Sequence, residues 1–179
     1  MRCQLRRGGL DGPGIYLEYR TRFFRRAGAP PLTQSIEIQM HEHADKPGLR
    51  IAAALLVRED GHTLLVRKRG TTSFMQPGGK IDPGETAPRA LVRELNEELG
   101  ISVDVDSLVP LGHFSAPAAN EIGLNVHADL FLVECDQSVK PEAEIEEIAW
   151  VAANVLPDFP LAPLTGSFVL PLHNGLRRG

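Results

Sequence analysis

The sequence predicts an α/β fold, a layered α/β/α sandwich in which helices cover both faces of a mixed β-sheet. Three observations predict it. Apolar stretches of strand length lie on both sides of one amphipathic helix, a glycine-rich turn leads into that helix, and a second helix is expected near the end of the chain. The chain has 179 residues, 42% of them hydrophobic, which is enough for one domain with a substantial core.

Five apolar stretches have the length and composition of β-strands. A polar turn at 59–62 separates the first two, so we expect the second to return beside the first as a hairpin partner. The polar loop 115–122, which contains Asn120 and Glu121, separates the third stretch from the fourth. The fifth carries Trp150, which we expect to be buried. The five strands are expected at 51–57, 63–67, 101–114, 123–134 and 147–151.

The best-defined helix is expected over 87–99. No glycine interrupts this segment, and Pro88 falls in the first turn, where a missing N–H does no harm. Thr86 is the expected N-cap, and Gly100 lies where the helix should end.

A shorter helix should close the fold over 165–172. Thr165 is its expected N-cap, and Pro171 should limit its length because proline disrupts a helix interior. Two helices and the strands between them give the three layers of the sandwich.

The first helix has an acidic face and a separate apolar face. At 100° per residue, Glu94, Glu97 and Glu98 share one narrow face, whereas a separate apolar stripe suits packing on a sheet. Carboxylates about 4 Å apart repel by roughly 4 kcal/mol at an effective dielectric near 20, and Arg93 supplies only one compensating charge. Hard divalent cations such as Mg²⁺ or Mn²⁺ suit such all-oxygen ligands. The apolar stripe consists of Leu91, Val92, Leu95 and Leu99.

The segment Gly79–Ile101 resembles the Nudix box, G-x5-E-x7-R-E-U-x-E-E-x-G-U with U apolar, at every specified position. A solvated acidic face is the common alternative for three such carboxylates alone, and the complete pattern argues against it. The resemblance implies a Nudix hydrolase, which is a metal-dependent enzyme that cleaves a nucleoside diphosphate linked to another moiety. It also implies the Nudix-type sandwich with a loop-helix-loop catalytic motif.

Site residues follow from this resemblance position by position. It implies that Glu94, Glu97 and Glu98 ligate Mg²⁺, with Mn²⁺ as a substitute, and that the Gly79 carbonyl is a backbone ligand. It implies an orienting role for two further residues and makes Glu94 the leading candidate for the general base. The two orienting residues are Glu85 and Arg93.

Residues outside the box are weaker candidates for substrate binding. Strand alternation sends Arg67 and Arg69 to the same side, where either is within reach of a phosphate, and Lys80 lies inside the box. A solvated strand edge is the alternative for the two arginines. Phe74 suits stacking on a base or packing in the core. The sequence leaves open which downstream acid joins the site, among Glu121, Glu142, Glu144, Glu146 and Glu147.

Two details concern the substrate. The segment PGGKIDPGET resembles the corresponding segment of MutT-like members, which hydrolyse (deoxy)nucleoside triphosphates. We therefore expect a (deoxy)nucleoside triphosphate as the substrate. Pro117 lies one place from the position of a proline in ADP-ribose-cleaving members, so ADP-ribose or a nucleotide-sugar is one alternative. Dinucleoside polyphosphates or capped RNA are a further alternative. A non-catalytic nucleotide-binding sensor is the alternative from another class, but such modules usually lack one or more of the box carboxylates.

Composition bounds the partners and the compartment. The net charge of −4 argues against nonspecific duplex nucleic-acid binding, so a small-molecule nucleotide is the expected partner. Cys3 and Cys135 are too few for a disulfide framework, which predicts a reducing, cytoplasmic location. No apolar stretch is long enough for a membrane span or a signal peptide. Members of the family are often dimers, but no residue here specifies an interface.

The first 48 residues differ from the rest. They carry eight Lys or Arg against five acids, a charge of +3, and the remaining residues carry −7. We expect 1–48 to be a disordered or loosely attached segment and 49–179 to be the Nudix hydrolase domain. Two alternatives are a mis-assigned start, with synthesis beginning at Met40, and an Arg-rich targeting peptide.

Overall fold

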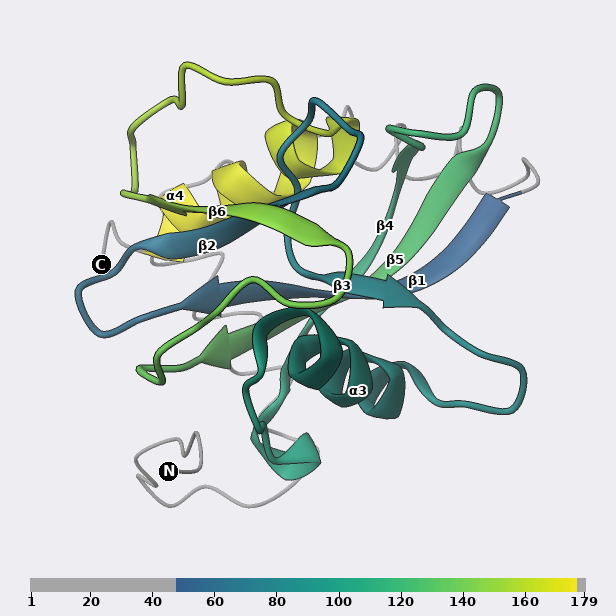
Figure 1. Cartoon of the computed structure of the whole chain (residues 1–179), viewed down its shortest axis with the longest axis horizontal. Coiled ribbons are helices and arrows are strands. Elements are labelled where there is room, and N and C mark those ends of the chain that lie inside the picture. The colour runs from purple at the N-terminus through teal and green to yellow at the C-terminus, as the bar shows by residue number, and fades with distance from the viewer. Residues whose placement is uncertain (1–47, 177–179) are drawn as a thin grey trace.

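The computed structural model describes residues 48–176, which form one mixed sheet with a helix on each face (Figure 1). The expectations for residues 1–47 lie outside this described range and stay predictions. None of the helices in the described range combines the length and apolar character needed to cross a membrane.

The sheet has six strands, and its central strand β1 pairs in parallel with β5 and antiparallel with β3. The path across the sheet is β4-β5-β1-β2-β6, and β3 pairs with β1 beside this path. Both parallel and antiparallel pairs are therefore present, which confirms the predicted mixed sheet. The strands are β1 (Gly48–Val57), β2 (Thr63–Lys68), β3 (Gly78–Lys80), β4 (Val109–Pro117), β5 (Asn125–Glu134) and β6 (Ile145–Val151).

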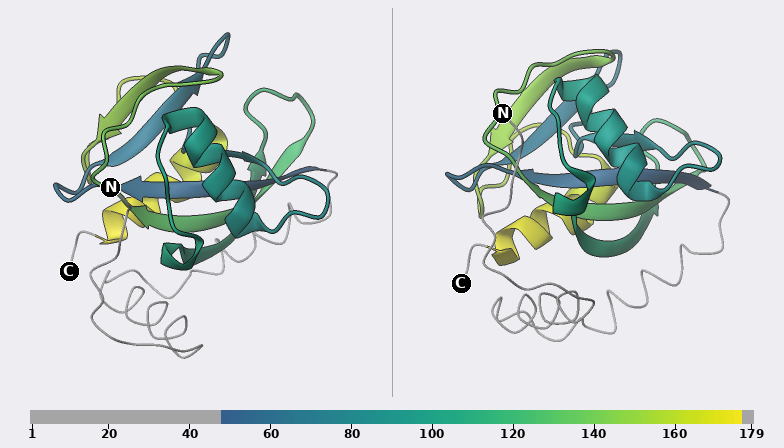
Figure 2. Two further views of the ribbon diagram at one scale, coloured as in Figure 1. Left: turned by 60° about the horizontal axis from the view of Figure 1, so that its bottom comes forward. Right: turned by 90° about the horizontal axis from the view of Figure 1, so that it is seen from below.

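The two sheet faces hold separate cores because strand side chains alternate. Helix α3 (Ala87–Leu99) covers one face, and helix α4 (Leu170–Leu176) with the π-helical turn η2 (Thr165–Val169) covers the other (Figure 2). Ala52, Ala54 and Leu56 of β1 pack toward α3, whereas Ala53 and Leu55 pack toward η2. This arrangement confirms the predicted α/β/α sandwich.

Helix α3 has the predicted bounds. Thr86 is extended and occupies the N-cap position, although its side chain makes no capping hydrogen bond. Gly100 ends the helix in the left-handed conformation at φ 64°, and its N–H bonds the Asn96 carbonyl, as expected for a glycine after a helix. Leu91, Leu95 and Leu99 are fully buried on the sheet, as their spacing predicts.

The strand predicted at 101–114 is wrong over its first half. A 3-10 turn, η1 (Val105–Ser107), precedes β4, and Asp104 Oδ1 accepts a hydrogen bond from the Asp106 N–H at 3.1 Å. Asp and Ser side chains that bond nearby backbone groups compete with a strand ladder. Strand β4 then continues to Pro117, three residues into the predicted loop.

The closing helix differs from its prediction at both ends. The chain is already helical at 163–164, and the Thr165 side chain bonds Gln76 rather than capping the helix. The helix passes Pro171 and continues to Leu176. Just before the proline, the Leu170 N–H bonds the Thr165 carbonyl, and this i→i−5 bond marks a wider turn.

The predicted hairpin partner leaves β1 almost at once. Val57 pairs with Thr63, after which β2 pairs with β6 over its whole length. Strand β3 occupies the edge of β1 instead, opposite Ile51–Ala53. Trp150 is half-buried rather than buried, with the Arg58 guanidinium 4.4 Å from the ring centroid.

Candidate functional site

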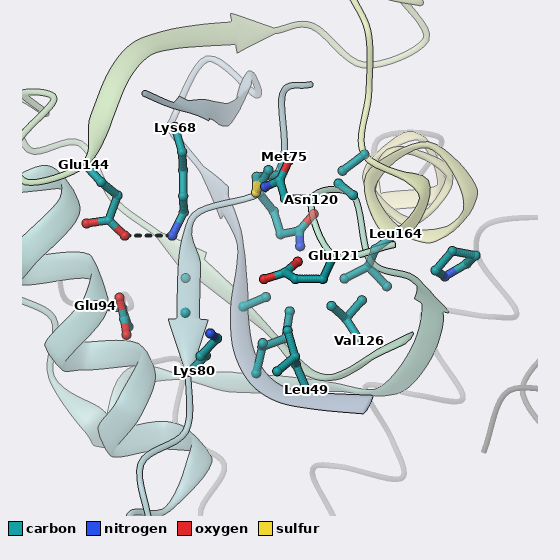
Figure 3. A pocket seen from close by; sticks show the side chains of 18 residues that line it. Leu49, Lys68, Met75, Lys80, Glu94, Asn120, Glu121, Val126, Glu144 and Leu164 are labelled. Carbon is teal, nitrogen blue, oxygen red and sulfur yellow. Dashed lines mark hydrogen bonds and ion pairs between the residues drawn. The ribbon is translucent and has the colours of Figure 1, made fainter. Parts of the chain in front are cut away.

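A pocket of about 340 Å³ opens between the segment Gly79–Ile101 and the sheet face covered by η2. Figure 3 shows Lys68, Lys80, Glu94 and Glu144 on one side of this pocket, and Leu49, Val126 and Leu164 together with the acidic Glu121 on the other. The charged side contains Lys68, Lys80, Glu94 and Glu144, and the apolar side contains Leu49, Ile51, Ala53, Met75, Val126 and Leu164. Pro117 at the end of β4 also lines the pocket, and the loop after β4 adds Ala119, Asn120 and Glu121.

Glu94 lies against strand β3 because residue 79 is glycine. A Cβ at Gly79 would lie 2.2 Å from the Glu94 carboxyl carbon and 2.4 Å from each of its oxygens. Any other residue at this position would therefore displace the carboxylate. The side chain of Glu94 is only 12% exposed, at the charged side of the pocket.

Arg93 ties the glycine turn to the helix. Its Nη2 donates to Glu85 Oε2 at 2.9 Å and to the Lys80 carbonyl at 3.0 Å, and its Nε donates to Glu85 Oε1 at 3.2 Å. Its Nη1 donates to Glu94 Oε1 at 2.8 Å. These bonds agree with the orienting role that the family resemblance implies for Arg93 and Glu85.

Glu98 is fully buried, which the amphipathic pattern of α3 does not predict for a carboxylate. Lys68 Nζ lies 2.9 Å from Glu98 Oε1, and the Gly78 N–H donates to Glu98 Oε2 at 3.0 Å. Lys68 also pairs with Glu144 Oε1 at 2.9 Å. Lys68 therefore bridges the buried Glu98 and the more exposed Glu144.

The electrostatics of this cluster show the cost of burial. Burial raises the pKa of the Glu98 carboxyl above its usual range, by more than the neighbouring Lys68 lowers it. Burial lowers the pKa of Lys68, but Glu98 and Glu144 together raise it to about 12. Hydrogen bonds from Arg93 lower the pKa of Glu85 and keep it ionised.

The donor set fits a hard divalent cation. Glu94 and Glu98 supply carboxylate oxygens one helical turn apart, and oxygen donors of this kind are the ligands that Mg²⁺ prefers. Glu97 lies at the exposed edge of this group, since its side chain is 55% exposed and its carboxylate lies 3.7 Å from Arg93 Nη1, the atom that also bonds Glu94. Within residues 48–176, no three His, Cys, Asp or Glu side chains converge on one point. The complete ligand set, which includes Gly79, stays a prediction.

The structure places Lys68, rather than Arg67 or Arg69, at the pocket. Arg67 pairs with Glu146 at 2.7 Å and with Glu147 at 2.9 Å across the β2–β6 ladder. Arg69 is exposed and lies outside the pocket lining.

The sequence contained the signal for Lys68. Leu64 and Val66 lie on the α3-facing side of β2, and alternation sends Lys68 to that same side. Lys80 lines the pocket, and its role in substrate binding stays a prediction. Phe74 belongs to the core, where its ring centroid lies 4.2 Å from that of Phe159.

Two of the five downstream acids line the pocket. Glu144 does so while paired with Lys68, and Glu121 does so from the loop after β4. Glu146 and Glu147 pair with Arg67 instead, and Glu142 lies beside the C-terminal end of α3. Glu121 and Glu144 are therefore the two downstream acids placed to meet a bound molecule.

Comparison with known proteins identifies the family. The NUDIX domain model matches residues 48–170. The CTP pyrophosphohydrolase of Escherichia coli (strain K12) is 30% identical over 120 residues, which cover 64% of this chain and 84% of that protein. An 8-oxo-dGTP diphosphatase of Haemophilus influenzae is 43% identical over 61 residues, which cover 32% of this chain and 45% of that relative's length.

Solved structures agree with the sequence relatives. A MutT NUDIX hydrolase from Burkholderia pseudomallei superposes with a TM-score of 0.60 at 26% identity. The match covers 71% of this chain and 98% of that structure. The chain belongs to the NUDIX family, and its Nudix domain is that of a pyrophosphohydrolase.

Proposed function

We propose that this protein hydrolyses a pyrophosphate bond in a (deoxy)nucleoside triphosphate with the help of Mg²⁺. The two-sided pocket carries the proposal. Its charged side, with Lys68, Lys80 and Glu94, suits a polyphosphate and its cations, and its apolar side suits a base. Two of the relatives named above, the CTP pyrophosphohydrolase and the 8-oxo-dGTP diphosphatase, carry the names of nucleoside triphosphate substrates.

The metal ligands in this proposal are Glu94, Glu98 and the Gly79 carbonyl, with Glu97 joining from the exposed side of α3. Bound Mg²⁺ would neutralise charge on the phosphates and lower the pKa of the attacking water. Mn²⁺ is the expected substitute, since it accepts the same oxygen ligands.

The remaining residues of the site position the substrate phosphates and hold Glu94 in place. Lys80 faces the pocket and suits a phosphate oxygen, while Arg93 holds Glu94 against the glycine turn. Glu94 remains the leading candidate for the general base. Glu121 is the alternative, because it lines the pocket from the side away from α3 (Figure 3).

A hydrolysis assay tests this function. The protein is mixed with Mg²⁺ and a panel of nucleoside triphosphates, ADP-ribose and a nucleotide-sugar, and release of phosphate or pyrophosphate is measured. We expect Glu94→Gln and Glu98→Gln to fold and to lose at least about 100-fold in kcat, since they remove charge where phosphoryl transfer is stabilised. Glu146→Gln is the matched control, because Glu146 pairs with Arg67 away from the pocket.

The same panel decides between the alternatives. Preferential cleavage of ADP-ribose or a nucleotide-sugar would replace the triphosphate assignment with the other substrate class. Nucleotide binding without cleavage of any compound would favour a non-catalytic sensor. Near-normal turnover by Glu98→Gln would contradict the proposed metal site. A cytoplasmic location and a homodimeric state stay predictions.

A further inference from the structure

Gln76 is a buried polar residue on the pocket wall that no step of the proposed reaction uses. It is 6% exposed and lines the pocket. The Thr165 hydroxyl donates to Gln76 Oε1 at 2.7 Å, and Thr165 itself is completely buried. A buried hydroxyl and amide that bond each other hold the amide in one orientation.

The backbone around Gln76 is fixed on both sides. Its neighbour Met75 exchanges two backbone hydrogen bonds with Val66 of β2, at 2.7 and 2.9 Å. Its other neighbour, Pro77, accepts a hydrogen bond from the Ala54 N–H of β1 at 2.9 Å. Gln76 is therefore held between two strands of the sheet, as a recognition residue should be.

The orientation of the Gln76 amide leaves its Nε2 group available to donate hydrogen bonds. Its oxygen is committed to Thr165, and Nε2 makes no hydrogen bond to any residue in the described range 48–176. The pocket wall around it is largely apolar, with Met75, Ala162 and Leu164. A molecule in the pocket thus meets a fixed N–H donor in apolar surroundings.

We infer that Gln76 determines base specificity by donating its Nε2 hydrogens to an exocyclic carbonyl oxygen of the nucleobase, with Thr165 as the residue that orients it. This inference rests on the proposed function, since it concerns the apolar side of the same pocket. A donor favours a base with a carbonyl at the contacted position over one with an amine there. A site that hydrogen-bonds one group discriminates against the analogue that lacks it.

Two pairs of substrates test the inference. ITP and ATP differ by a carbonyl against an amine at the 6-position, and UTP and CTP differ likewise at the 4-position. We expect the wild type to prefer the carbonyl member of the pair that it cleaves better. Gln76→Glu should shift the kcat/KM ratio at least about tenfold toward the amine member, because a carboxylate accepts rather than donates.

Two further variants separate recognition from folding. Gln76→Met keeps the size but removes the donor, and we expect the substrate ratio to fall to within about twofold of one. We expect Tm to fall by only a few degrees, because the protein stays folded although the buried Thr165 hydroxyl loses its acceptor. Thr165→Val replaces the hydroxyl with a methyl group of similar size, and we expect the substrate ratio to fall toward one, because the Gln76 amide loses the bond that orients it.

Failure of this inference and failure of the proposed function give different results. If triphosphates are cleaved but neither Gln76 variant changes the substrate ratio, the inference is overturned and the proposed function stands. If no triphosphate is cleaved, the corresponding monophosphates are titrated by calorimetry. A carbonyl preference in binding that Gln76→Met removes would support the inference, and its absence would overturn it.

Discussion

The ion pair between Lys68 and Glu98 is the residue-scale feature on which the charged side of the pocket depends. A fully buried carboxylate is costly unless a charge and hydrogen bonds compensate it. Lys68 supplies the charge, and the Gly78 N–H supplies one hydrogen bond. Lys68 is shared with the more exposed Glu144, so it has a second partner when a cation approaches Glu98.

We expect Lys68→Met to lower the free energy of unfolding by roughly 3 kcal/mol in the presence of EDTA, because it leaves Glu98 buried without a counterion. Urea unfolding measures the change. Added Mn²⁺ should recover part of the loss, since a ligand that binds the folded state stabilises it. Lys80→Met is the control, as Lys80 lines the pocket but is exposed. Equal stability of Lys68→Met and wild type in EDTA would contradict this account.

Gly79 permits a second residue-scale prediction. The Cβ of an alanine at this position would overlap the Glu94 carboxylate, so Gly79→Ala should displace Glu94. We expect kcat to fall by about 100-fold, which is a typical effect of a 1 Å displacement at a catalytic site. The fold should persist, and circular dichroism with a thermal scan checks this. Gly166→Ala is the matched control, because its Cβ would meet only ordinary contacts at 4.0 Å. Full activity in Gly79→Ala would show that Glu94 tolerates the displacement.

At the scale of elements, the sequence predicts best where one pattern acts alone. Helix α3 has clear periodicity and a terminal glycine, and its observed bounds match the predicted ones. The strand predicted at 101–114 failed because Asp104 and Ser107 bond nearby backbone and form η1. The closing helix extended past Pro171 because the wide π turn before it accommodates a residue without an N–H.

The sequence predicts the positions of the box residues better than it predicts the other residues of the pocket. The resemblance of one segment to the Nudix box implied that Glu94 lies near the glycine turn and that Arg93 and Glu85 tie this turn to the helix, and the structure places Glu94 against Gly79 and Arg93 beside Glu85. Lys68 required the correct choice between the two faces of β2. Gln76 and Thr165 carried no signal, since their contact depends on how η2 packs against the segment before β3.

Within residues 48–176, the sheet separates the core beneath α3 from the core beneath η2, with a third, smaller cluster around Phe74 and Leu170. The stability of the domain should reflect that separation. Leu95 packs α3 on one face, and Val169 packs η2 on the other. We expect Leu95→Ala to cost about 3 kcal/mol and Val169→Ala about 2 kcal/mol in unfolding free energy. The two changes share no contacts, so their effects should add to within about 0.5 kcal/mol.

Urea unfolding of the two single variants and the double variant measures this additivity. A single transition in every case would indicate that both layers unfold together. Two resolved transitions, or a large departure from additivity, would show that the layers are not joined as one cooperative unit.

The parallel pairing of β1 with β5 has a consequence for how the chain matures on the ribosome. Ten successive residue pairs join these strands, from Gly48 with Asn125 to Val57 with Glu134, and every box residue lies between them in the chain. Strand β1 is synthesised first, and the edge that pairs with β5 stays without its partner until β5 leaves the ribosome. The catalytic helix can form locally in that interval, but its supporting platform is completed late, which favours slow folding and a demand for chaperones during translation.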